Sequence, residues 1–279
     1  MAITSDGLST YIIHYTPLTE RLWHLKNSYL WHLLLPKVVT EETIKEFREF
    51  LPPSVLLWPN SSVRAEILAQ VTKIHPILLR NLFAIQNDET LEYPEPFRAY
   101  SAALISQIYP FYLQAISALS DKNYDLSCQH LCALILFLRG SNDTCLILED
   151  DSIACESNQE HFSIQLEYIN SSAYTLKPIF IDISNSLNLR PKTGFYDHEF
   201  CIKRVLPGQT RCASSYLVNR AAAIEIINNS FPIVLPVDWH YSYVMSTHEI
   251  NTYWSNRPVF YQGSQGEWYN SNQSNRNNL

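Results

Sequence analysis

The chain lacks an excess of positive charge. It carries 20 Lys and Arg residues against 27 Asp and Glu residues, which gives a formal net charge of −7 at pH 7. A protein that binds nucleic acid regardless of its sequence needs surplus Lys and Arg to replace the counterions of the phosphates. The composition therefore predicts that nucleic acid is not a partner.

Long hydrophobic runs are also missing. The longest uninterrupted apolar stretch, residues 131–138, is far shorter than the ~20 residues that cross a bilayer as a helix. Residues 1–10 have no basic segment leading into an apolar core of the secretory type. We therefore expect a soluble, cytoplasmic protein, and peripheral association with the inner face of the membrane stays open.

The six cysteines form no CxxC pair and no regular framework. A chain of 279 residues is long enough to bury a core without disulfides. We expect reduced thiols, most of them buried.

Three consecutive carboxylates, Glu149, Asp150 and Asp151, follow directly on the apolar residues 145–148. Like charges side by side at the end of a buried strand are unfavourable unless a cation or solvent compensates them. Hard oxygen ligands suit Mg²⁺ or Mn²⁺, which are commonly held by one or two carboxylates together with substrate phosphates. A solvated acidic turn or a helix cap is the alternative.

Residues 145–148 are apolar on both faces, which is typical of a central strand in a sheet that is covered on both sides. Ligands of such sheets bind beyond the carboxyl ends of the strands, where these three carboxylates stand. The alternation of strand and helix patterns predicts an α/β fold with a mainly parallel central sheet. Strands are expected at 11–14, 55–58, 145–148 and 179–183, and helices at 126–138 and 218–227.

We expect a single domain over residues 1–268. Helical spacing around a proline-bearing loop indicates a helical insertion at about 60–125, and residues 186–205 are interpreted as an irregular polar loop. Residues 269–279, mostly Asn, Ser and Gln, are expected to form a disordered tail.

Four ordered segments of the chain resemble glycosyltransferase family 25, the bacterial lipopolysaccharide and collagen galactosyltransferase relatives. Their order and approximate spacing agree over about half of the chain, which makes coincidence a poor explanation. In one departure, Cys128 and Gln129 separate Ser127 from His130, where the family's helix reads Ser-His. The segments are 13–21 (IHYTPLTER), 126–131 (LSCQHL) together with 146–151 (LILEDD), 210–218 (TRCASSYLV) continuing to 236–239 (PVDW), and 258–264 (PVFYQGS).

The resemblance implies a GT-A-like, Rossmann-type fold that binds a nucleotide sugar, with residues 149–151 as its DxD-like motif. Asp151 is then assigned to the metal, Mn²⁺ or Mg²⁺, and Glu149 to the ribose or to the edge of the metal site, with Asp150 beside them on the nucleotide sugar. A metal ion held by a carboxylate stabilises, as a Lewis acid, the charge that the leaving diphosphate gains.

The turn after the first strand is a candidate phosphate site. Thr16 and Pro17 predict a helix start, with Thr16 as N-cap and Pro17 at the first helical position. Free backbone N–H groups and the positive end of the helix dipole would then face a nucleotide. Arg21 could pair with the diphosphate, and Glu20 could orient Arg21 or a ribose hydroxyl. The alternative is a capped surface helix with an ordinary charged pair.

Further contacts to the donor come from the other segments. Arg211, isolated among small residues, is a second candidate phosphate contact. Gln262 and Ser264 are candidates for hydrogen bonds to the donor. A histidine such as His130 is more often a helix residue with its hydrogen bonds made inside the protein than a ligand-binding residue. The resemblance nevertheless favours a position of His130 in the nucleotide-sugar cleft.

Asp238, between Val237 and Trp239 at an expected strand end, is the candidate general base. An inverting transfer needs a base that takes the proton of the acceptor hydroxyl, and partial burial beside an indole would raise the pKa of a carboxylate toward the useful range. A carboxylate that caps the next helix is the alternative. His240 and Glu267 are weaker rivals for the same role.

The sequence thus predicts a metal-dependent inverting glycosyltransferase that moves a hexose onto a glycan acceptor, such as lipopolysaccharide or another surface polysaccharide. Galactose is the expected sugar, and UDP-galactose is its expected donor. One alternative is a catalytically silent relative that serves as a glycan-binding or assembly module. A metal-dependent phosphoesterase is less favoured, because the sequence shows no second cluster of His and Asp ligands for a two-metal site.

Overall fold

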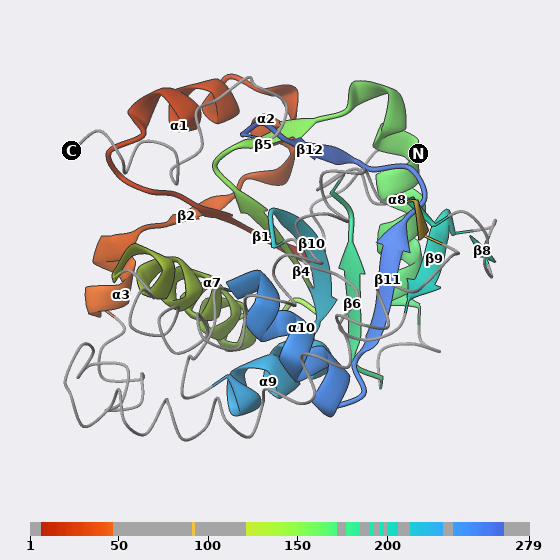
Figure 1. Ribbon diagram of the computed structural model, residues 1–279. Coiled ribbons are helices and arrows are strands. Elements are labelled where there is room, and N and C mark those ends of the chain that lie inside the picture. Colours follow the sequence, from red (N-terminus) through yellow and green to blue (C-terminus); the bar gives the residue numbers. More distant parts are fainter. Residues whose placement is uncertain are drawn as a thin grey trace.

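The computed structural model describes residues 7–46, 91–92, 121–171, 177–184, 190–191, 196–197, 200–205, 213–230 and 237–264. Its main feature is an eight-stranded sheet with the strand order β2-β1-β4-β10-β6-β11-β9-β8 (Figure 1). In that order the strands are Lys37–Val39, Leu8–Ile13, Thr144–Glu149, Ser215–Asn219, Ile179–Asp182, Asn251–Ser255, Ile202–Val205 and Tyr196–Asp197.

The sheet is mixed. Strands β2, β1 and β4 pair in parallel, as do β6 and β11, whereas β10 pairs antiparallel with both β4 and β6. Strand β9 pairs antiparallel with β11 and with β8. Within the described part of the chain, six of the eight strands therefore run in one direction, and β10 and β9 run against them. The prediction of an α/β fold is confirmed, while the pairing is more mixed than the mainly parallel sheet that we expected.

Helices cover both faces of the sheet (Figure 1). Because side chains alternate along a strand, Tyr11 and Ile147 face α7, α9 and α10, whereas Ile12 and Leu148 face the opposite core with α2 and α8. Each face thus has its own buried cluster. These helices are Tyr29–Leu34 (α2), Asp121–Arg139 (α7), Gln159–Asn170 (α8), Arg220–Asn229 (α9) and Val237–Thr247 (α10).

Shorter elements surround the carboxyl end of β4. Strand β5 (Ser152–Ala154) leaves β4 after the acidic residues and pairs antiparallel with β12 (Phe260–Gln262). This ribbon brings residues 260–264 back to the end of β4. The remaining elements are α1 (Thr19–Lys26), α3 (Glu41–Glu46), a 3-10 turn at Glu156–Asn158, and the paired strands β3 (Leu91–Glu92) and β7 (Arg190–Pro191).

The structure corrects several expected boundaries. Helix α1 begins at Thr19 after Leu18, so Thr16 is not its N-cap and Pro17 is not in its first turn. The helix expected at 218–227 begins at Arg220, because Asn219 ends β10 and its side-chain oxygen accepts a hydrogen bond from the Ala222 N–H at 3.0 Å. The loop expected at 186–205 contains two strands of the main sheet, β8 and β9.

Other predictions hold or lie outside the described residues. The strands expected at 11–14, 145–148 and 179–183 and the helix at 126–138 are confirmed as β1, β4, β6 and α7. The strand expected at 55–58, most of the insertion at 60–125 and the tail at 269–279 lie outside the described ranges. None of the described helices is long and apolar enough to span a membrane.

Candidate functional site

The acidic residues 149–151 lie where four distant parts of the chain meet. Strands β1 and β4 end side by side, with Ile13 paired to Glu149. Strand β10 begins beside them, and the Glu149 N–H donates to the Ser214 carbonyl at 2.7 Å. Helix α7 contributes His130, and the turn after β12 contributes residues 263–264. The site therefore lies beyond the carboxyl ends of two neighbouring parallel strands of the sheet, β1 and β4.

Asp150 binds these elements together. Its Oδ2 contacts Nδ1 of His14 at 2.9 Å and accepts the Tyr15 N–H at 3.1 Å, and its Oδ1 accepts from Nη1 of Arg21 at 3.0 Å. His14, Arg21 and Asp150 are all buried. Both carboxylate oxygens are thus engaged, and Asp150 fixes the ends of β1, β4 and the start of α1. The same contact engages Arg21, and its predicted pairing with a diphosphate stays a prediction.

Asp151 has one engaged oxygen and one without a partner. Its Oδ2 accepts the Ser264 N–H at 3.3 Å, and its backbone carbonyl accepts the Gly263 N–H at 2.8 Å. The side chain is buried, yet Oδ1 has no hydrogen-bond partner among the described residues. A buried acceptor without a partner is costly, and a bound cation would satisfy it.

The charge of Asp151 is poorly compensated. Burial raises the pKa of its carboxyl to about 6, and the charges of Glu149 and Asp150 add to the rise, while the hydrogen bond from Ser264 and the charge of Arg21 oppose it. A divalent cation would reverse this balance, because it favours the ionised carboxylate.

Glu149 lies on the α7 side of the same strand end. Its Oε1 is 3.5 Å from Nε2 of His130, and 20% of the side chain is exposed, so solvent or a ligand can reach it. Burial raises the pKa of Glu149 to about 7, with the charge of Asp150 adding and that of Arg21 opposing. A carboxyl with this pKa exchanges protons near neutral pH, which is the range that general acid-base chemistry uses.

His130 is completely buried, and its Nε2, which faces Glu149, has no hydrogen-bond partner among the described residues. Its Nδ1 contacts the Tyr216 hydroxyl at 2.9 Å, and that hydroxyl donates to the Tyr241 hydroxyl at 3.4 Å. Burial lowers the pKa of His130 to about 3, so the ring is neutral. Because the Tyr216 hydroxyl donates its own proton to Tyr241, it accepts a hydrogen bond from Nδ1 of His130. We therefore assign the tautomer of His130 with the proton on Nδ1, and the lone pair of Nε2 then faces Glu149.

At most two carboxylates of this site are open to a divalent ion. Among the residues that the structure describes, no group of three or more His, Cys, Asp and Glu side chains is arranged to hold a metal. Asp150 is engaged on both oxygens, which leaves Asp151, through its unpaired Oδ1, and Glu149. One or two carboxylates are the usual protein share of a Mg²⁺ or Mn²⁺ site that is completed by water and substrate phosphates.

The turn after β1 differs from its expected role. Thr16, Pro17 and Glu20 are exposed, and the Thr16 hydroxyl donates to Oε2 of Glu41 at 2.6 Å instead of capping α1. Glu20 lies 3.9 Å from Nε2 of His24. At the other side of the site, Gln262 and Ser264 are half-buried, and Gln262 stands opposite Ser152 in the β5–β12 ribbon.

Asp238 lies in the first turn of α10 and not at a strand end. It is half-buried, and its carbonyl accepts the Ser242 hydroxyl at 2.9 Å. The same helix carries Tyr241, the last residue of the hydrogen-bonded series that runs from His130 through Tyr216. Its rival His240 is buried, and burial lowers its pKa to about 4. Arg211 and the second rival, Glu267, lie outside the described residues.

Sequence reasoning missed two residues of the site. His14 is the first residue after β1, and a polar side chain at the carboxyl end of a buried strand was a usable signal for it. Tyr216 lies within β10, between apolar neighbours, and the sequence carries no signal that its hydroxyl meets His130.

A scan of the chain against protein-family models finds no match, and a search of curated proteins finds none either.

Proposed function

We propose that the protein is a metal-dependent inverting glycosyltransferase that transfers a hexose from a nucleoside diphosphate sugar to a glycan acceptor. UDP-galactose is the proposed donor, lipopolysaccharide or another surface polysaccharide the proposed acceptor, and GT-A the proposed fold type within the α/β class. The proposal starts from the four segments that resemble glycosyltransferase family 25.

One observation carries the proposal: each of the four segments touches residues 149–151. The first does so through His14 and Arg21, which contact Asp150, and the second through His130, beside Glu149. The other two contacts are the Ser214 carbonyl on the Glu149 N–H and the Ser264 N–H on Asp151. Contacts between residues up to 136 positions apart bring these segments to one strand end, which supports reading them as parts of one site.

The mixed sheet is compatible with this proposal. Ligands of open α/β sheets bind outside the carboxyl ends of the strands, which is where Asp150 and Asp151 stand. The single unpaired, buried carboxylate oxygen in this group, Oδ1 of Asp151, supports a ligand of positive charge. A bound Mn²⁺ or Mg²⁺ would supply Lewis-acid stabilisation of the leaving diphosphate.

The residues of the chain have distinct parts in the proposed reaction. Asp150 and Arg21 hold the strand end rigid, and the Ser264 N–H orients Asp151 through its Oδ2. Asp238 takes the proton of the acceptor hydroxyl while that oxygen attacks the anomeric carbon from the face opposite the leaving group. The proton passes to Asp238, the glycosidic bond to the diphosphate breaks, and the configuration at the anomeric carbon inverts.

The test is an assay of nucleoside diphosphate release. The protein is incubated with Mn²⁺ and a panel of UDP-, GDP- and other nucleotide hexoses, with and without lipopolysaccharide fragments as acceptors. We expect release with one donor, dependent on Mn²⁺ and stimulated by an acceptor. Silence across the whole panel would argue against the transferase. Release of inorganic phosphate from simple phosphate esters would favour a phosphoesterase instead.

A further inference from the structure

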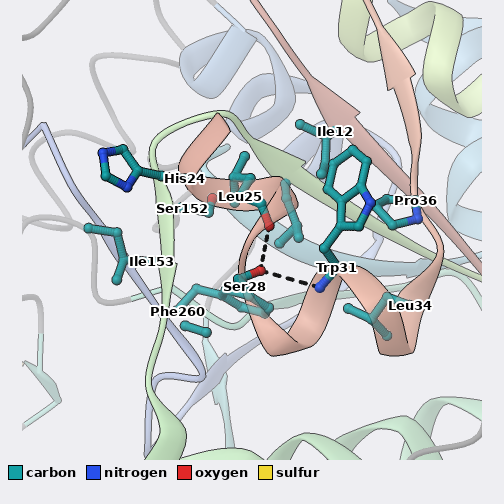
Figure 2. A pocket seen from close by; sticks show the side chains of 12 residues that line it. Ile12, His24, Leu25, Ser28, Trp31, Leu34, Pro36, Ser152, Ile153 and Phe260 are labelled. Atoms are coloured by element: carbon teal, nitrogen blue, oxygen red, sulfur yellow. Dashed lines mark hydrogen bonds between the residues drawn. The ribbon is translucent and has the colours of Figure 1, made fainter. Parts of the chain in front are cut away.

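A cavity of about 210 Å³ lies on the other face of the sheet from Glu149, between the α1–α2 hairpin and strands β1, β4 and β5 (Figure 2). Its floor is made of buried apolar side chains: Ile12, Leu34, Leu148 and Phe260. His24, the one exposed member of the lining, stands at the rim. We call this space the α1–α2 cavity.

The hydroxyl groups on its wall are already satisfied. Ser28 Oγ donates to the Leu25 carbonyl at 2.6 Å and accepts the Trp31 N–H at 3.3 Å, as Figure 2 shows. Ser152 Oγ donates to the Ser214 carbonyl at 2.9 Å and lies 3.0 Å from Ser215 Oγ. A nucleobase carries several polar edge groups that need partners when buried. This wall offers hydrocarbon contact and little hydrogen bonding, so it suits an alkyl chain better than a base.

The size of the cavity also suits an apolar ligand. A cavity of about 150 Å³ lined by Leu, Ile and Phe stays dry and takes up benzene. The α1–α2 cavity is larger and has the same kind of floor, while its wall also includes Ser28 and Ser152 and its rim opens to solvent at His24. It therefore has room for several methylene groups.

The outer surface of the hairpin has the character of an amphiphile site. Three large hydrophobic side chains are exposed among the described residues, and two of them, Trp23 at 60% and Leu35 at 71%, belong to the segments that roof the cavity. Lys26 is exposed, and its Nζ lies 5.9 Å from the centroid of the Trp31 ring, which lines the cavity. The opposite charge nearby is Glu20, 3.9 Å from His24. A cation thus lies over the ring of one of the residues that line the apolar space.

We propose that the α1–α2 cavity binds the hydrocarbon tail of a single-chain amphiphile, whose anionic head group lies beside Lys26. The site uses none of the residues assigned to the donor or the metal, so it stands independently of the transferase proposal. It adjoins that site in the chain, because Leu148 precedes Glu149 and Ser152 follows Asp151. Amphiphile binding would place a lipid-bearing molecule next to the candidate active site.

The test is calorimetric titration of the full chain with decanoate and with uncharged decanol, both below the concentrations at which they aggregate. We expect saturable binding of one molecule of either ligand. Ala154→Leu fills the cavity from β5 and should weaken binding of both about tenfold or more, in line with the loss of buried methylene contacts. Lys26→Gln should weaken decanoate about threefold and leave decanol unchanged.

Lys45→Gln is the matched control for Lys26→Gln. Lys45 is also an exposed helix lysine, but it belongs to α3 and pairs with Glu42 at 2.6 Å. The Lys45→Gln protein should bind decanoate and decanol with the affinity of the wild type. Because Lys26 is on the surface, its variant remains informative if Ala154→Leu does not fold.

Four results would overturn the proposal. They are the absence of saturable decanoate binding to the wild type, wild-type affinity in a folded Ala154→Leu protein, equal effects of the two lysine variants, and binding to phosphatidylglycerol vesicles without binding of monomeric decanoate. The last result would assign the exposed Trp23 and Leu35 to a bilayer surface. None of these results depends on nucleotide binding or sugar transfer, so they leave the transferase proposal to its own assay.

Discussion

Oδ1 of Asp150 lies 3.0 Å from Nη1 of Arg21, and both side chains are buried. Its neighbour Asp151 is equally buried but leaves Oδ1 without a partner among the described residues. Two adjacent aspartates of one acidic run therefore differ in role. Asp150 stabilises the junction of β1, α1 and β4, and Asp151 is the carboxylate that can take a ligand.

Asp150→Asn should destabilise the fold. The substitution removes the charge that compensates Arg21, and breaking one partner of a buried ion pair costs about 3–5 kcal/mol. Urea denaturation followed by circular dichroism measures this as a fall in the free energy of unfolding. Glu42→Gln, which breaks the exposed pair with Lys45, is the control and should change stability by less than about 1 kcal/mol. Equal stability of the two variants would contradict the structural role of Asp150.

The metal-free protein should lose stability as the pH rises from 5 to 8. Folding raises the pKa of Asp151 to about 6 and that of Glu149 to about 7, so the folded state holds protons that the unfolded state releases. Stability from such groups is complete below their unfolded pKa, near 4, and is lost as the pH passes their folded pKa. Unfolding by urea at a series of pH values measures the loss.

Asp151→Asn is the matched variant for this pH dependence. An amide resembles the protonated acid, so the variant should be more stable than the wild type at pH 8, by about 1–3 kcal/mol, and similar to it at pH 4. Adding Mn²⁺ at pH 8 should raise the stability of the wild type and leave the variant nearly unchanged. A constant difference between the two proteins from pH 4 to pH 8 would show that the environment of Asp151 does not raise its pKa.

Tyr216→Phe should lower the free energy of unfolding, because it leaves a buried nitrogen of His130 without its hydrogen-bond partner. Phenylalanine keeps the stacking against Phe180, at 4.8 Å between ring centroids, but leaves Nδ1 of His130 buried without its hydroxyl partner. We expect a loss of about 1–3 kcal/mol in unfolding free energy. Tyr241→Phe removes the hydroxyl at the far end of the chain and should cost less, because its contact with Tyr216 is 3.4 Å long. The reverse order would contradict the assigned arrangement.

Asp238→Asn separates a general base from a helix cap. Loss of the base should lower turnover by about 10²-fold to 10⁴-fold while nucleotide affinity survives, because the base acts on the acceptor. Loss of a cap would cost about 1 kcal/mol of stability with little kinetic effect. Turnover and UDP affinity are measured at saturating acceptor. If transfer stays within a few-fold of the wild type, Glu149, with its pKa of about 7, becomes the candidate base.

The sequence predicted the strand end that carries the site because its signal is local. A run of apolar residues followed by Glu149, Asp150 and Asp151 determines both the strand and the position of the acids. The same holds for α7, which helical spacing predicts at 126–138 and which the structure extends to Asp121–Arg139. These elements need no information about their partners.

The different roles of Asp150 and Asp151 could not be predicted from the sequence. Whether Asp150 or Asp151 keeps a free oxygen depends on His14, Arg21 and Ser264, which lie more than 100 positions away in the chain. The strand β10 was not predicted, and its last two residues fall within the helix expected at 218–227. Its signal is not local, because the strand is specified by its pairing with β4 and β6. Thr16 is not an N-cap because α1 begins three residues later, at Thr19, and the Thr16 hydroxyl instead donates to Glu41 of α3.

The most direct test is calorimetric titration of UDP into the wild type and into Asp151→Asn, each with Mn²⁺ and with a chelator. The account predicts micromolar binding to the wild type only when Mn²⁺ is present, and binding weakened about 100-fold in the variant, because Asp151 supplies a metal ligand. A silent glycan-binding or assembly module would bind no nucleotide under either condition. Absence of UDP binding, or binding of equal strength with and without Mn²⁺, would contradict the account.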